Sequence, residues 1–131
     1  MSKVLIWIGK FQSKGDFERY MDQSAFRKWW ADNDEDNLEL SCQFCKEVGI
    51  DCYDEDLLIM NFCHEGINGL LNLIPANTDK LISVINEKGI QDANAVICYN
   101  CGEDISLQKA SNALSVTFLG SFKFDLTYTG T

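Results

Sequence analysis

The chain has 131 residues, of which 46% are hydrophobic and 11% aromatic, and this length and composition predict one globular domain spanning 1–131. Its formal net charge of −9 disfavours nucleic acid and anionic membranes as partners. No stretch approaches the ~20 apolar residues of a membrane span, and the N-terminus lacks a signal-peptide core, so a cytoplasmic location is expected.

The first half of the chain predicts one strand followed by several helices. Residues 3–9 are apolar and β-branched, which is typical of a buried strand. Apolar residues at helical spacing predict one or two amphipathic helices across 14–31, with a break near Ser24. A short helix is predicted over 42–48, whereas the continuously apolar run 57–63 fits either a strand or a helix.

The second half predicts helices and then strands. Residues 66–74 and 78–88 favour helices, and 95–99 predict a short strand. Alternating residues across 113–128 predict either two strands joined by a tight turn or one strand with a bulge at Gly120. This order predicts an α+β fold: a mostly antiparallel sheet of the N-terminal strand and a C-terminal strand meander, with helices packed on one face.

Residues 32–56 form a strongly acidic segment. They contain ten acidic residues and a single basic one, so this segment carries a charge of −9 while the rest of the chain sums to zero. Such a concentrated negative field raises the encounter rate with a cationic partner. The segment is therefore a binding surface, a metal site or a solvated loop. Its acidic residues are Asp32, Asp34, Glu35, Asp36, Glu39, Glu47, Asp51, Asp54, Glu55 and Asp56.

The start of this segment is similar to a calcium-binding loop. Carboxylate or amide oxygens stand at the first, third and fifth positions from Asp32. However, Asn37 replaces the glycine that the loop needs at position six, and Gln43 replaces the bidentate glutamate at position twelve. The calcium motif fails at both diagnostic positions.

Two CxxC pairs offer alternative chemistry. Cys42 with Cys45, and Cys98 with Cys101, would give the four thiolates of a tetrahedral zinc site, although 52 residues separate the pairs. The first pair also fits a small thiol oxidoreductase, but its acidic surroundings are expected to raise the thiol pKa. Buried free cysteine is the simpler interpretation.

No catalytic residue and no cofactor are predicted. His64 is the only histidine, and its neighbour Cys63 is badly placed for a nucleophile pair because sequence neighbours rarely face one another. The sequence also lacks a glycine-rich phosphate loop and the common hydrolase motifs. The chain is therefore not expected to be an enzyme.

Short segments in order along nearly the whole chain resemble the Immunity protein 22 family. The resemblance implies a small acidic α+β protein that protects bacteria by binding and blocking a polymorphic toxin domain, in many cases a nuclease. It is carried by residues 7–9, 13–20, 44–50, 53–56, 94–97 and 118–122, and among these Trp7, Gly9, Tyr53, Asp54 and Asp56 match recurring positions.

The resemblance and the charge together predict a partner-binding surface for a cognate bacterial toxin. An acidic inhibitor can complement a cationic nuclease site, and aromatic residues among the acids would anchor it. The alternative is a solvated acidic loop whose aromatics point inward. The predicted contact residues are Asp51, Tyr53, Asp54, Glu55, Asp56, Asp34, Asp36 and Trp30.

Overall fold

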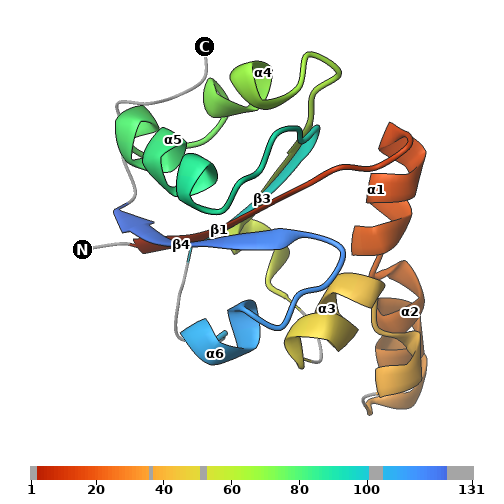
Figure 1. Ribbon diagram of the computed structural model, residues 1–131. Coiled ribbons are helices and arrows are strands. Elements are labelled where there is room, and N and C mark those ends of the chain that lie inside the picture. The colour runs from red at the N-terminus through yellow and green to blue at the C-terminus, as the bar shows by residue number, and fades with distance from the viewer. Residues whose placement is uncertain (1–2, 36, 51–52, 101–104, 124–131) are drawn as a thin grey trace.

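A four-stranded antiparallel sheet forms the centre of the computed structural model, which describes residues 3–35, 37–50, 53–100 and 105–123 (Figure 1). The strand order is β2-β3-β1-β4, so the N-terminal strand β1 lies between β3 and β4 and pairs with both. The α+β class is confirmed, and the ambiguous run 57–63 contains a strand. The strands are β1 (Lys3–Gly9), β2 (Leu58–Phe62), β3 (Ala95–Tyr99) and β4 (Thr117–Lys123).

Helices cover both faces of the sheet, which corrects the prediction of helices on one face (Figure 1). Leu5 and Trp7 of β1 face one hydrophobic cluster, and Val4 and Ile6 face the other. A strand that is apolar at every position needs cover on both sides. The first face carries α1 (Lys14–Met21), α3 (Gln43–Val48) and α6 (Leu107–Ala110), and the second carries α4 (Ile67–Leu71) and α5 (Thr78–Glu87).

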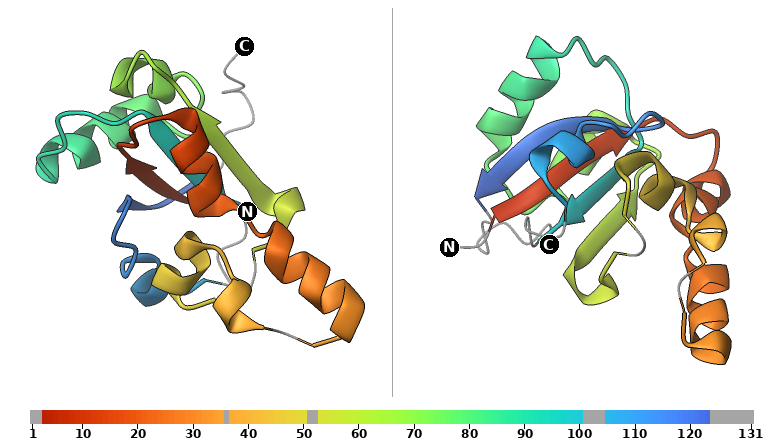
Figure 2. Two further views of the ribbon diagram at one scale, coloured as in Figure 1. Left: turned by 90° about the vertical axis from the view of Figure 1, so that its right-hand side faces the viewer. Right: turned by 90° about the horizontal axis from the view of Figure 1, so that it is seen from below.

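The break predicted near Ser24 separates α1 from α2 (Ser24–Asn33). Ser13 caps α1 by accepting a hydrogen bond from the backbone N–H of Asp16 at 3.1 Å. Helix α2 projects away from the sheet at the side of the molecule (Figure 2). A short 3₁₀ turn, η1 (Leu38–Leu40), packs beside it.

Strand β4 is one strand with a bulge, the second of the two alternatives drawn from the sequence. Its pairing with β1 shifts register between Ile6 and Trp7. Gly120 has φ 126°, a conformation that other residues rarely adopt, so glycine permits the extra residue here.

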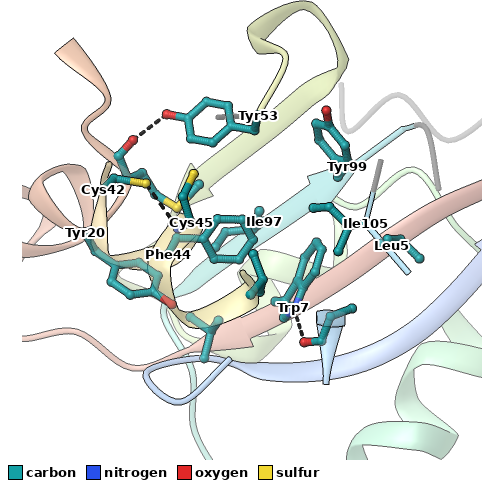
Figure 3. Packing of buried hydrophobic residues seen from close by; sticks show 14 of the residues in the cluster. Leu5, Trp7, Tyr20, Cys42, Phe44, Cys45, Tyr53, Ile97, Tyr99 and Ile105 are labelled. Carbon is teal, nitrogen blue, oxygen red and sulfur yellow. Dashed lines mark hydrogen bonds between the residues drawn. The ribbon is translucent and has the colours of Figure 1, made fainter. Parts of the chain in front are cut away.

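Trp7 is the centre of the core on the α1–α3 side of the sheet (Figure 3). Its side chain is fully buried, and its indole Nε1 donates a 2.9 Å hydrogen bond to the carbonyl of Ala110 in α6. The indole meets Phe44 of α3 edge-on, with ring centroids 5.1 Å apart, and packs against Phe118 of β4. One side chain thus connects β1 to two helices and a neighbouring strand.

Candidate partner-binding surface

Exposed carboxylates dominate the described part of the acidic segment. None of these side chains forms an ion pair with another described residue, since the ion pairs there are Lys10–Asp92 and Arg19–Asp16. Their negative charge is therefore not neutralised locally. The exposed acids are Asp32, Asp34, Glu35, Glu39, Asp54 and Asp56.

A turn formed by residues 53–57, here called the acidic turn, is held in place by hydrogen bonds to α1 and β3, and Figure 3 shows the one made by Tyr53. The hydroxyl of Tyr53 donates a hydrogen bond to the carbonyl of Met21 at the end of α1. The backbone N–H of Asp54 donates to the Tyr99 hydroxyl of β3 at 3.0 Å, and the Asp54 carboxylate accepts from the N–H of Asp56 at 2.9 Å. Asp54 and Asp56 are thereby fixed at the start of β2.

Tyr53 itself points into the protein. It is only 7% exposed, and the guanidinium of Arg27 lies 5.3 Å from its ring centroid. Burial, with a smaller contribution from the Cys42 thiol, raises the pKa of Tyr53 to about 12. This placement favours the inward-pointing alternative for Tyr53, whose role here is to hold the acidic turn.

Trp30 is exposed at the end of α2. Half of its surface is accessible, whereas Trp29 is partly buried and its indole Nε1 has no hydrogen-bond partner among the described residues. Trp30 lies one helical turn beyond Arg27, so both side chains emerge on the same side of α2. Asp34 ends the helix in the left-handed conformation, its N–H donating to the Trp30 carbonyl at 2.7 Å.

The structure therefore brings together two of the predicted groups. Trp30 and Asp34 share the end of α2, and the contact of Arg27 with Tyr53 links that helix to the acidic turn. Asp36, Asp51 and the side chain of Glu55 lie outside the described residues, so their participation stays a prediction.

Cys42, Cys45 and Cys98, the described members of the proposed zinc site, do not come together. Cys42 and Cys45 belong to the cluster on the α3 side of the sheet, whereas Cys98 of β3 belongs to the cluster on the α5 side. A tetrahedral site needs all four sulfurs within ~2.3 Å of one ion, and the sheet separates Cys98 from Cys42 and Cys45. The alternative of a four-cysteine site is wrong. Cys101 lies outside the described residues.

The surroundings of Cys42 also differ from expectation. Its sulfur caps α3 by accepting from the Cys45 N–H at 3.4 Å. Hydrogen bonding, first from the Cys45 side chain and then from backbone N–H groups, outweighs burial and lowers the pKa of the Cys42 thiol. The acids nearby do not raise it. Yet Cys42 is 5% exposed and Cys45 fully buried, so neither thiol is open to a substrate.

Glu47 belongs to the acidic segment by sequence, but in the structure it joins three elements through hydrogen bonds. Its carboxylate accepts hydrogen bonds from the Tyr20 hydroxyl at 2.7 Å and from the backbone N–H groups of Leu114 and Ser115 at 2.8 and 3.0 Å. Burial opposes ionisation, but these donors outweigh it and hold the pKa of Glu47 below its ordinary value. One carboxylate therefore joins α1, α3 and the segment before β4.

Glu47→Gln is expected to make stability less dependent on pH. Because the pKa of Glu47 is lower in the folded chain, its contribution is present above the unfolded pKa and is lost as the pH falls through the folded pKa. At neutral pH, we expect a loss of about 1 kcal/mol, since the carboxylate is only partly buried. Urea unfolding between about pH 7 and pH 3 should show a shallower acid slope than the unaltered chain.

Glu39→Gln is the matched control, because the exposed carboxylate of Glu39 accepts no hydrogen bond from the described residues. This variant should keep the acid slope of the unaltered chain. Equal slopes for both variants would show that the contacts of Glu47 do not contribute to stability.

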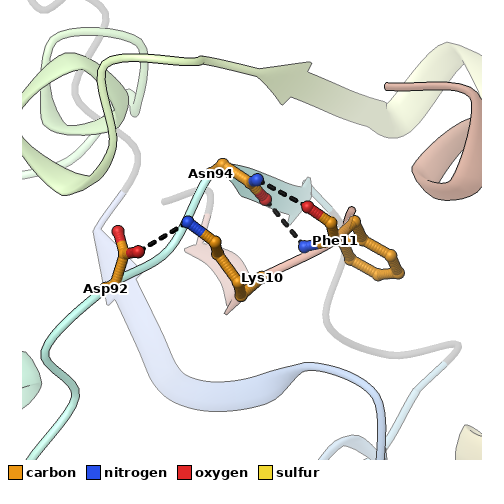
Figure 4. Close-up of polar contacts among 4 residues, drawn as sticks. All are labelled: Lys10, Phe11, Asp92 and Asn94. Carbon is orange, nitrogen blue, oxygen red and sulfur yellow. Dashed lines mark hydrogen bonds and ion pairs between the residues drawn. The ribbon is translucent and has the colours of Figure 1, made fainter. Parts of the chain in front are cut away.

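Asn94, which belongs to the segment 94–97 of the resemblance, is a buried polar residue for which the sequence predicted no structural role (Figure 4). Its side-chain oxygen accepts from the Phe11 N–H at 2.9 Å, and its nitrogen donates to the Phe11 carbonyl at 2.7 Å. The side-chain amide of Asn94 thus makes the two hydrogen bonds that a paired strand would make to Phe11, and it fixes the chain directly after β1. The available signal was a single polar residue directly before the fully apolar run 95–99.

Comparison with known proteins agrees with the resemblance seen in the sequence. The family model named Immunity protein 22 matches residues 4–125. No curated protein and no solved structure matches the chain. Within the described ranges, no helix has the length and apolar character needed to cross a membrane. The chain belongs to the Immunity protein 22 family.

Proposed function

We propose that this immunity protein works in the cytoplasm by binding a cognate toxin domain of the nuclease type and occluding its cationic active site. Membership of the family supports a toxin protein as the partner. The proposed contact surface combines the end of α2, with Trp30 and Asp34, and the acidic turn. Inhibition of this kind is binding alone and uses no catalytic residue.

The unneutralised acidic surface carries this proposal. A nuclease site must hold phosphate, so it presents cationic groups that exposed carboxylates can complement. Here six exposed acids in the described part of the segment have no ion-pair partner there, and the tryptophan beside them is half exposed. The charges would accelerate encounter, and the aromatic side chain would supply buried contact area.

Neutralising the acidic turn should slow association with the toxin. For Asp54→Asn with Asp56→Asn, we expect the association rate constant to fall about threefold to tenfold at low salt and to depend less on ionic strength. The dissociation rate constant should change less, because exposed charges act mainly on encounter. Stopped-flow mixing with the cognate toxin domain measures both constants.

Asp79→Asn with Glu87→Gln is the matched control. These two acids are exposed on α5, on the other side of the sheet, and their loss changes the net charge equally. An association rate that falls equally in both variants would point to net charge alone. No change in either variant, with protection of toxin-expressing cells retained, would count against the acidic turn as the contact.

A further inference from the structure

The outer edge of β2 presents unpaired backbone groups. β2 ends the sheet, and its inner side pairs with β3. Asn100 N–H donates to the Leu57 carbonyl at 2.8 Å, and Cys63 N–H donates to the Asn94 carbonyl at 2.7 Å. Because such bonds alternate along an antiparallel pair, the N–H and C=O groups of residues 58, 60 and 62 point outward. Within the described ranges, no strand pairs with them.

This edge also lacks the devices that usually protect a sheet edge. The sequence of β2, LIMNF, contains no charge, proline or glycine, and its pairing with β3 runs without a register shift. The opposite edge, β4, has a bulge, a glycine at positive φ and the charged residue Lys123. Every residue of β2 is at least partly exposed, whereas every residue of β3 is buried.

A cleft runs beside this edge. It has a volume of about 500 Å³ and lies between Met60 of β2 and the junction of α1 with α2. An added strand would lie ~4.8 Å from β2, with alternate side chains directed toward this cleft. The floor includes the buried ring of Tyr53, which also supports the acidic turn. The edge and the proposed contact surface are therefore continuous.

The charges around the outer edge of β2 favour binding of a positively charged segment. Exposed carboxylates of Asp54 and Asp56 precede β2, and that of Glu65 follows it. Two further acids, Glu18 and Asp22, line the cleft with two arginines. One of those, Arg19, is paired with Asp16, and the other, Arg27, lies over Tyr53. Negative charge thus predominates at both ends of the edge, whereas the charges that line the cleft nearly balance.

We propose that the outer edge of β2 binds an extended, lysine- or arginine-rich segment of the toxin domain as a fifth strand of the sheet. Backbone hydrogen bonds to residues 58, 60 and 62 fix the register, and the surrounding carboxylates contact the basic side chains. This inference rests on the proposed function and names the element that docks the toxin. It also explains why an exposed apolar edge is left without protecting residues.

Amide hydrogen exchange of the unaltered chain tests the strand addition directly. In the free protein, the amides of Met60 and Phe62 should exchange rapidly, whereas those of Ile59 and Asn61, which point toward β3, should exchange slowly. Adding the toxin domain should slow the exchange of Met60 and Phe62 about tenfold or more.

Met60→Pro provides the matching variant, because proline removes only an outward N–H and is tolerated at a sheet edge. Its Kd for the toxin domain should rise about tenfold or more, since a partner carbonyl loses its donor. Met60→Ala keeps that N–H and should change Kd much less. Circular dichroism establishes whether the proline variant is folded; if it is not, the exchange measurement decides.

Three results would overturn the strand addition. If the toxin binds while Met60 and Phe62 stay unprotected, the edge is not used, although the proposed function survives. If the unaltered chain fails to bind the toxin, the proposed function fails and this inference fails with it. If these amides are already protected in a free chain that sediments as a dimer, a second copy occupies the edge.

Discussion

Trp7→Ala is expected to lower the free energy of unfolding by about 3–5 kcal/mol, the usual range for truncating a large buried aromatic side chain. The indole is fully buried between β1, α3 and α6, and contacts Phe44 and Phe118. Its removal leaves a cavity and also leaves the Ala110 carbonyl with only the long, 3.5 Å hydrogen bond from the Ala113 N–H. Because domains of this size are typically stable by about 5–15 kcal/mol, this loss removes a large part of the stability.

Urea unfolding followed by far-ultraviolet circular dichroism measures this loss. Trp7→Phe separates its two parts, since phenylalanine keeps an aromatic ring beside Phe44 but removes the donor to Ala110, at an expected cost of about 1–3 kcal/mol. Leu114→Ala is the control for an apolar truncation at the surface, because Leu114 is 85% exposed. A loss below about 1 kcal/mol for Trp7→Ala would mean that the core can close around the missing ring.

Local chemistry explains which elements the sequence predicted. Strand β1 follows from an unbroken apolar run, and α1 and α2 follow from apolar residues at helical spacing, with Ser13 capping α1. All of these signals depend on near neighbours. The glycine ending α5 is equally local: Gly89 has φ 69°, and the Ile90 N–H folds back to the Ile85 carbonyl at 3.1 Å.

Features that depend on distant contacts were predicted less well. Helix α6 has only four residues, and it is held by the hydrogen bond from Trp7, 103 residues earlier. The helices on the second face were foreseeable, because the consecutive apolar residues of β1 and β3 can be buried only from both sides. The alternative zinc site is wrong because successive residues of a strand point to opposite faces of the sheet, and Cys98 points to the α5 side. The spacing between the two CxxC pairs does not show which face Cys98 occupies.

In the candidate site, too, local features were predicted and features that depend on distant contacts were not. Charge is a property of composition, so the acidic segment was visible at once, but the roles of its members depend on contacts from elsewhere. Tyr53 is turned inward by the carbonyl of Met21, 32 residues away, and Glu47 is engaged by donors of 114–115. Trp30 stays exposed because its helix projects from the sheet, which no local pattern indicated.

Trp30→Ala is expected to weaken toxin binding about thirtyfold or more while leaving the fold intact. Tryptophan is enriched among the residues that dominate protein interfaces, and this one stands half exposed among carboxylates. Because half of its surface is already in water, its truncation should cost about 1 kcal/mol or less of stability. Isothermal titration calorimetry with the toxin domain gives Kd, and urea unfolding gives the stability.

Leu107→Ala is the matched control, since Leu107 is 58% exposed on α6 and lies outside the proposed surface. Its Kd should match that of the unaltered chain. Kinetics then separates the two kinds of contact: loss of Trp30 should act mainly by raising the dissociation rate constant, whereas loss of Asp54 and Asp56 should act mainly on association. If Trp30→Ala leaves both constants unchanged, then the toxin does not cover the end of α2, and the contact must be sought along the acidic turn and β2 alone.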